Sequence, residues 1–169
     1  MRLLRFSGYL FIVLLAPTAI VMGLGSRLPV EHRAVATAVV GAPVDRVWEM
    51  ITDVQAQPGW RTGLKGVEML PAGAEGPCWR EVQAWMSMPL CATASEAPRR
   101  RVVRIADPRL PFGGRWTYAL EAEGPAATRV TITEEGTTGP AMWRFVGHYV
   151  MGEDGQIKQY LRDLEKHSR

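Results

Sequence analysis

The chain has 169 residues, of which 47% are hydrophobic and 22% charged, proportions typical of a folded globular domain and not of a disordered chain. Its formal net charge of +3 arises within residues 1–33, because the remaining residues carry equal numbers of acidic and basic side chains. A nucleic-acid-binding surface needs a larger basic excess than this, so we expect no nucleic-acid partner.

The first element in chain order is an apolar segment. Residues 6–26 contain no charged side chain, and about 20 such residues are enough to span a bilayer as a helix. Arg2 and Arg5 precede the segment, so the positive-inside rule keeps the N-terminus in the cytoplasm and sends the following domain outward. We therefore expect a transmembrane anchor within residues 1–28. The alternative is a cleaved signal, which would leave the domain secreted or periplasmic.

A strand that ends near Val39 is followed by a short amphipathic helix. Pro43 suits the first position of this helix, because proline has no N–H to leave unpaired and its φ is already helical. One apolar face then recurs with helical spacing, at Val44, Val47, Trp48 and Ile51. A Pro-Gly-Trp turn that ends at Trp60 closes the unit.

The rest of the chain predicts antiparallel strands and then one long helix. Alternating apolar and polar residues, separated by turns rich in glycine and proline, predict strands over residues 66–70, 78–85, 90–97, 99–106, 115–123 and 128–135. A final helix is predicted from Pro140 to about Lys166, although Gly152 and Gly155 weaken its middle. A helix of this length beside so many strands must bury its apolar stripe against the sheet.

The two cysteines, Cys78 and Cys91, lie on neighbouring predicted strands. A hairpin that turns near Ser87 and Met88 would place them several residues out of register, too far apart for a disulfide. We therefore expect both to be free or structural cysteines. Neither they nor the three histidines are spaced as metal ligands, so we expect no metal site and no cofactor.

Several segments resemble one known superfamily. The segment APVDRVWEMITDVQAQPGW is similar to the opening signature of START-like proteins, also called SRPBCC or helix-grip proteins. The segments GGRWTYALE and TRVTITEEG, followed by GPAMWRF and YLRDLE, are similar to the closing half of many members. The resemblance covers residues 34–167. It implies an α+β helix-grip fold, in which a curved antiparallel sheet of about six or seven strands surrounds a long C-terminal helix and encloses an apolar cavity.

The resemblance directs attention to aromatic side chains that such a cavity would expose. Aromatic rings supply a large apolar contact area, and tryptophan and tyrosine add a polar group that suits an amphipathic ligand. For any single tryptophan, ordinary core packing is the more common explanation. The predicted ligand-binding residues are Trp60, Trp79, Trp85, Trp116, Tyr118, Trp143, Val146 and Val150.

Few polar side chains are candidates for chemistry inside the cavity. Glu81 shares a strand face with Trp79, and if both pointed inward the carboxyl group would have a raised pKa and could act as an acid or base. We favour the opposite facing, with Glu81 in solvent. Tyr118 is the second catalytic candidate, because its hydroxyl could hydrogen-bond a ligand. Arg101 and Arg144 could meet an anionic head group, but a solvated charge is the more common state.

Three functions fit these observations. The favoured one is binding or carriage of a hydrophobic small molecule or lipid, next to the membrane that holds the N-terminal helix. The first alternative is an enzyme that resembles polyketide cyclases and uses the same cavity. The second is an interaction module whose cavity is filled by its own side chains. A membrane anchor favours the binder, because it holds a carrier next to its lipid supply. The predicted export and the lack of a clear acid or base group count against a cyclase, which would be expected in the cytosol.

Overall fold

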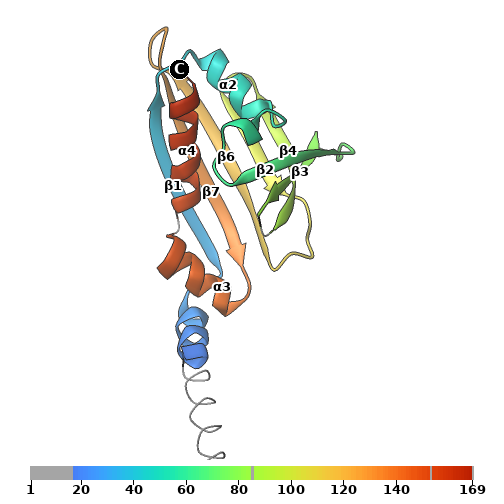
Figure 1. Cartoon of the computed structure of the whole chain (residues 1–169), viewed down its shortest axis with the longest axis vertical. Coiled ribbons are helices and arrows are strands. Elements are labelled where there is room, and N and C mark those ends of the chain that lie inside the picture. The colour runs from blue at the N-terminus through green and yellow to red at the C-terminus, as the bar shows by residue number, and fades with distance from the viewer. Residues whose placement is uncertain (1–16, 85, 153, 169) are drawn as a thin grey trace, which may run out of the picture.

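The computed structural model describes residues 17–84, 86–152 and 154–168. Its main element is an antiparallel sheet in the order β1-β7-β6-β5-β4-β3-β2 (Figure 1). The strands are β1 (Glu31–Val40), β2 (Leu64–Leu70), β3 (Cys78–Gln83), β4 (Ser87–Glu96), β5 (Arg100–Ile105), β6 (Phe112–Ala122) and β7 (Thr128–Thr138). The helical elements are α2 (Val44–Thr52), the 3-10 turn η1 (Gln57–Gly59), α3 (Ala141–Val146), the π-helical turn η2 (Gly147–Met151) and α4 (Gly155–His167).

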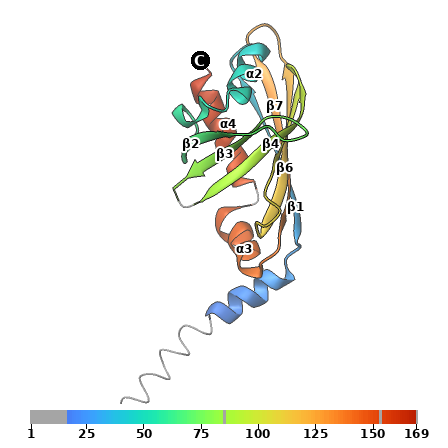
Figure 2. The same cartoon turned by 90° about the vertical axis from the view of Figure 1, so that its right-hand side faces the viewer.

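The core lies between one face of the sheet and the helices α2 and α4. Helix α4 runs along β1 and β7, and the strands from β5 to β2 curve away from it (Figures 1 and 2). Ala34 and Ala36 of β1 belong to the buried cluster beside α4, and their small side chains allow the helix to approach the strand closely. The larger members of the cluster include Val47, Met50, Ile51, Leu120, Val130, Ile132, Ile157, Tyr160, Leu161 and Leu164.

Helix α2 forms as its apolar spacing predicts. Pro43 immediately precedes its first residue, and Val47, Met50 and Ile51 are buried. After the helix, the Asp53 carboxylate accepts a hydrogen bond from the Ala56 N–H at 3.2 Å, so Asp53 is a turn residue as the sequence indicates. This turn leads directly into η1, which contributes to the site described below.

The predicted 27-residue C-terminal helix is wrong in one respect, because the chain forms separate helical pieces. Gly152 has φ 75°, a backbone conformation that side chains with a Cβ rarely adopt, and it ends the helical path that begins at Ala141. The π-helical turn η2 precedes this break and changes which residues share a face. Of these pieces, α4 packs along β1 and β7, while α3 lies at the end of the molecule far from the C-terminus (Figure 1).

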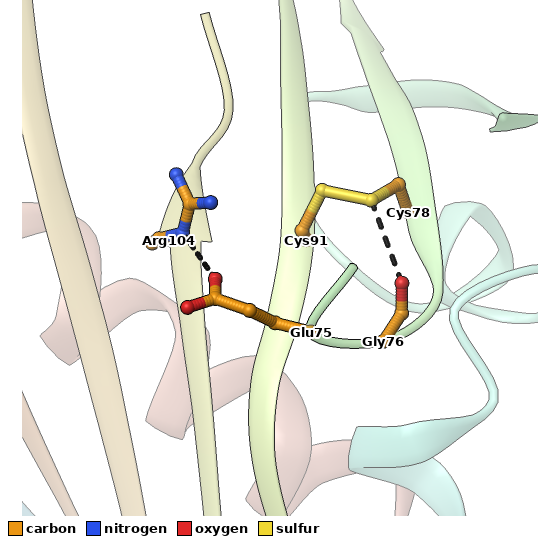
Figure 3. Close-up of a disulfide and its surroundings, with 5 residues drawn as sticks. All are labelled: Glu75, Gly76, Cys78, Cys91 and Arg104. Atoms are coloured by element: carbon orange, nitrogen blue, oxygen red, sulfur yellow. Dashed lines mark hydrogen bonds and ion pairs between the residues drawn. A yellow bond between two sulfur atoms is a disulfide. The ribbon is translucent and has the colours of Figure 1, made fainter. Parts of the chain in front are cut away.

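The expectation of unpaired cysteines is also wrong, because Cys78 and Cys91 form a disulfide (Figure 3). The predicted hairpin turn lies too late in the chain. Ser87 and Met88 already belong to β4, so the strands connect through residues 84–86 and Cys78 pairs directly with Cys91. Their Cα atoms lie 4.1 Å apart. The ion pair between Arg104 and Glu75, at 3.0 Å, lies beside the disulfide (Figure 3).

The predicted N-terminal anchor falls mostly outside the described residues. Residues 17–27 are helical and project from the sheet domain (Figure 2). In the part of the chain that the structure describes, no helix is long and apolar enough to cross a membrane. The end of this helix contacts the domain through Arg144, whose Nε donates a hydrogen bond to the Gly25 carbonyl at 2.9 Å.

The disulfide should contribute measurably to stability. Its cysteines are 13 residues apart in sequence, and closing a loop of about 15 residues in the unfolded chain stabilises a protein by about 3 kcal/mol. We expect Cys78→Ala combined with Cys91→Ala to lower the free energy of unfolding by about 2–4 kcal/mol in urea titrations. Reductant should destabilise the wild type to the same extent and leave the double variant unchanged. Equal stability of both proteins without reductant would contradict the prediction.

Candidate functional site

Two adjacent cavities lie between the sheet and the helices. The inner chamber has a volume of about 70 Å³ and lies between β3, β5, β6 and α4, beneath the end of α2. The outer cavity has a volume of about 250 Å³ and extends toward α3 and residues 28–30. The two share lining residues, which are Gln83, Met88, Trp116 and Gln156. A ligand that entered the outer cavity would therefore meet the inner chamber at its end.

The inner chamber contains a buried ion pair. Nη1 and Nη2 of Arg61 donate to the two carboxylate oxygens of Glu81 at 2.5 and 3.1 Å. The expected solvent exposure of Glu81 is wrong, because only 3% of this residue is exposed. Glu81 does share the inward face of β3 with Trp79, as the strand alternation required. The strand pattern by itself could not show the buried facing, because the charge that compensates Glu81 comes from another segment.

Arg61 is positioned by the turn that follows α2. Gln57 is buried, its Nε2 donates to the Ile51 carbonyl at 3.0 Å, and its Oε1 accepts from Arg61 Nη1 at 2.8 Å. The backbone N–H of Arg61 also donates to the Gln57 carbonyl, at 2.8 Å. Burial acts to lower the pKa of Arg61, but the charge and hydrogen bonds of Glu81 outweigh it, so the pKa lies above its usual value.

Arg101 provides a second cation in the chamber. It is 4% exposed, which corrects the expectation that it is a solvated charge. On β5, Arg101 alternates inward with Val103, while Arg100 and Arg104 face solvent. Its Nη1 donates to the Ile51 carbonyl at 2.8 Å, and its guanidinium lies 5.3 Å from the centre of the Trp79 ring. Burial lowers the pKa of Arg101, but an arginine is basic enough to remain a cation near neutral pH.

Two tyrosines complete the polar part of the chamber. The ring centroids of Tyr118 and Tyr160 lie 5.5 Å apart, and both residues line the chamber. Burial raises the pKa of Tyr118 to about 12 and that of Tyr160 well above its usual value. Both therefore stay neutral phenols at physiological pH and can donate hydrogen bonds. Trp60 packs against Tyr160, with centroids 5.3 Å apart, and does not itself line either cavity.

Trp79 carries an unpaired hydrogen-bond donor. Its ring lines the inner chamber and is almost completely buried. Among the buried side-chain atoms of the described residues, only Trp79 Nε1 lacks a hydrogen-bond partner. An unsatisfied buried donor costs about 1–3 kcal/mol, so an acceptor placed in the chamber would remove that cost if it reached this nitrogen.

The outer cavity is mainly apolar, and some of the other predicted ligand-binding residues line it while others do not. Trp116, Trp143 and Val146 line it, and Trp143 is also 44% exposed, which places it near the opening. Val150 lines neither cavity and is 70% exposed, because the π-helical turn rotates it away from the stripe expected for a regular helix. Trp85 lies outside the described residues.

The polar groups of the outer cavity are largely satisfied by neighbouring groups. His32 and Glu134 approach one another, with His32 Nε2 at 3.5 Å from a Glu134 carboxylate oxygen. Arg144 donates to the carbonyls of Gly25, Thr138 and Gly139 at 2.9, 3.4 and 2.7 Å. Arg144 thus acts mainly as a contact between α3, the end of β7 and the N-terminal helix.

Among the ionisable residues that line the chamber, sequence reasoning missed Arg61 and Tyr160. Arg61 lies just beyond the Pro-Gly-Trp turn, in a segment without the periodicity that would predict a burial state. Tyr160 had a usable signal, because it continues the apolar stripe of the last helix between Ile157 and Leu164. Both catalytic candidates, Glu81 and Tyr118, line the chamber, but the Glu81 carboxylate forms an ion pair with Arg61.

The fold and the enclosed site define a helix-grip protein, with a curved antiparallel sheet around a C-terminal helix and a cavity between them. Residues 31–169 match the family described as polyketide cyclase/dehydrase and lipid transport, and the chain belongs to that family. Membership supports the binding of hydrophobic ligands in general. Among curated proteins, a sequence search found no significant match.

Solved structures share this fold at low sequence identity. A norcoclaurine synthase point mutant from Thalictrum flavum, bound to a transition-state analogue, is similar with a TM-score of 0.64 and 12% identity, over 82% of this chain and 94% of that one. A START superfamily protein from Mycobacterium smegmatis has a TM-score of 0.63 and 14% identity, over 81% and 97%. A protein from Thermus thermophilus has a TM-score of 0.65 and 18% identity, over 81% and 97%. These similarities establish the fold alone.

The pair of Arg61 and Glu81 should be strongly coupled in stability. Replacing one member leaves the other as a poorly compensated buried charge, which costs about 3 kcal/mol. We take the lower end of the range for buried pairs because 21% of the Arg61 side chain is exposed. We expect Glu81→Met and Arg61→Met each to lose about this much free energy of unfolding. The double variant should lose much less than the sum of the single losses. Additive losses in a double-mutant cycle would show that the two charges act independently.

Proposed function

We propose that this protein binds or carries a hydrophobic small molecule or lipid, with the ligand in the outer cavity and one end in the inner chamber. The observation that carries the proposal is the outer cavity of about 250 Å³, which approaches the lower end of the roughly 300–1,000 Å³ typical of small-molecule sites. Its lining is mainly apolar and includes Phe112, Trp116 and Val146. An open cavity of this size favours a binder over an interaction module that fills the space itself.

The polar chamber fits a binder better than a cyclase-like enzyme. A general base must be free to take a proton near neutral pH. Both carboxylate oxygens of Glu81 accept hydrogen bonds from Arg61, through its Nη1 and Nη2. Burial raises the pKa of Tyr118 to about 12. Neither group is therefore well placed to exchange a proton, although both lie where a ligand would end.

A position next to the membrane is supported by exposed apolar side chains around α3 and η2. Met142, Trp143, Tyr149 and Val150 are all exposed, and their segment contacts the end of the N-terminal helix through Arg144. Residues 28–30, which follow that helix, line the outer cavity. If residues 6–26 enter a bilayer, the opening of the cavity lies close to the lipid surface, where a carrier would collect its ligand.

We also propose that the domain lies outside the cytoplasm, as an anchored or a released protein. The disulfide between Cys78 and Cys91 supports this location, because disulfides form and persist in oxidising compartments and are rare in the cytosol. The charges of Arg2 and Arg5 before the apolar segment support the same orientation.

A bound ligand should co-purify with the protein. We expect organic extraction of the purified full chain, followed by mass spectrometry, to find a lipid or other hydrophobic molecule in near-stoichiometric amounts. Val146→Trp should lower this amount several-fold, because the larger ring occupies the outer cavity. Met142→Trp on the same helix is the matched control, since Met142 is exposed and lines no described cavity. Absence of any ligand from the wild type, or equal amounts in both variants, would argue against a carrier.

The same approach separates a carrier from an enzyme. If the protein is a carrier, Tyr118→Phe should change ligand binding only modestly, and the wild type should not convert the bound molecule. If the extracted molecule is instead converted by the wild type, and Tyr118→Phe abolishes that turnover while binding persists, the cyclase-like alternative replaces the carrier.

The orientation has a direct test. We expect a reporter that is active only after export, fused at the C-terminus, to be active in cells that make the full chain. Replacing Arg2 and Arg5 by Glu should reduce the exported fraction, because the charge asymmetry across the apolar segment is lost. Activity only from a reporter that works in the cytoplasm would refute the proposed location.

A further inference from the structure

The charges of the inner chamber do not balance. Its ionisable side chains with a charge near neutral pH are Arg61, Arg101 and Glu81, and Glu81 is engaged on both oxygens by Arg61. The hydrogen bond found for Arg101 goes to the neutral carbonyl of Ile51, at 2.8 Å. Within residues 17–84, 86–152 and 154–168, no carboxylate forms an ion pair with Arg101. One positive charge in the chamber is therefore uncompensated.

Other carboxylates on the surrounding elements are occupied elsewhere. Asp163 of α4 accepts hydrogen bonds from the backbone N–H and hydroxyl of Thr62 at 2.7 and 3.0 Å, and from Gln159 at 2.8 Å. Glu134 of β7 lines the outer cavity and lies beside His32. Burying a cation without an anion is costly, so the chamber favours an anionic group from outside the chain beside Arg101.

A second observation points to the same kind of ligand. Trp79 Nε1 is a buried donor without an acceptor, on a residue that lines the chamber beneath the Arg101 guanidinium. Tyr118 and Tyr160 add neutral hydroxyl groups, because burial raises their pKa values. The chamber thus holds an excess of donors, and an ion with several acceptor oxygens would satisfy more of them than a hydroxyl or amide group.

The dimensions restrict which anion fits. A chamber of about 70 Å³ has room for only a few non-hydrogen atoms, which suits a carboxylate better than a substituted phosphate. A planar guanidinium also matches the two oxygens of a carboxylate in a bidentate arrangement. The adjacent outer cavity, which is mainly apolar, would hold the rest of the molecule.

We propose that the inner chamber binds the carboxylate of a medium-sized hydrophobic acid, with Arg101 as its counter-ion and the apolar body in the outer cavity. This inference rests on the proposed binding function and specifies its ligand class. Arg144 is a poorer counter-ion, because its guanidinium already donates to three backbone carbonyls at the end of β7 and the N-terminal helix.

The test compares ligands that differ only in their head group. The full chain in phospholipid nanodiscs is titrated with decanoate, 1-decanol or decyl phosphate, with tryptophan fluorescence as the readout and empty nanodiscs to correct for partitioning. We expect decanoate to bind at least about tenfold more tightly than decanol, because a charge-assisted hydrogen bond replaces a neutral one. Decyl phosphate should bind more weakly than decanoate, and tighter binding of decyl phosphate would overturn the assignment to a carboxylate.

Variants of β5 locate the preference. Arg101→Gln should bring the affinity for decanoate down to that of the same variant for decanol, while Arg101→Lys should keep part of the preference. Arg100→Gln is the matched control, since Arg100 is the neighbouring residue on the solvent face and pairs with Glu96 at 2.9 Å. It should behave as the wild type. If Arg101→Gln does not fold, Arg101→Lys and the wild-type ligand comparison still decide the question.

The outcomes separate this inference from the proposed function. Equal binding of decanoate and decanol by the wild type would overturn the carboxylate site and leave the hydrophobic carrier in place. Failure of the wild type to bind any of the three compounds would count against the carrier itself. A preference for decanoate that persists in Arg101→Gln would assign the counter-ion role to another residue and so contradict the proposal.

Discussion

The structure depends on how one short helix covers a wide, curved sheet. Helix α4 has 13 residues, so it is only about 20 Å long, and it packs along β1 and β7 at one side of the sheet. The inner faces of β3 to β6 curve around the remaining space, which the helix does not fill. Packing in protein interiors is normally close to that of crystals, so unfilled space on the buried face of a sheet costs stability that a bound ligand would restore.

The end of the chain determines the shape of that space. The helical path starts at Ala141 on the far side of the outer cavity, passes through a π-helical turn and breaks at Gly152 before α4 begins. Because of this break, α3 flanks the opening instead of continuing the line of α4. The outer cavity therefore lies between α3 and the sheet, beside the residues that follow the N-terminal helix.

Inside the chamber, the polar groups form a set that is only partly satisfied. Arg61 and Glu81 compensate one another, and their geometry depends on Gln57 in the turn after α2. Arg101 and Trp79 keep unused donor capacity at a place where the apolar cavity ends. A fully satisfied network would mainly stabilise the fold, whereas the remaining donors would favour one orientation of the ligand that we propose.

Local pattern alone determined much of this protein. The spacing of Val47 and Ile51 predicted α2, and period-two alternation with turn residues predicted the antiparallel strands and their order along the chain. The resemblance of these segments to START-like proteins correctly indicated the helix-grip fold and its family. These features depend on residues close together in sequence, whose periodicity reports directly which face is buried.

Only the tertiary structure decided the register, the charges and the helix break. The sequence predicted the hairpin turn too late in the chain, which put Cys78 and Cys91 out of register. In the structure the two residues pair directly across β3 and β4 and form a disulfide. Glu81 and Arg101 were expected in solvent because isolated charges avoid burial, yet Arg61 and the Ile51 carbonyl, from segments distant in sequence, provide their partners. Whether a charged side chain can be buried depends on such partners, and a strand's own sequence does not contain them.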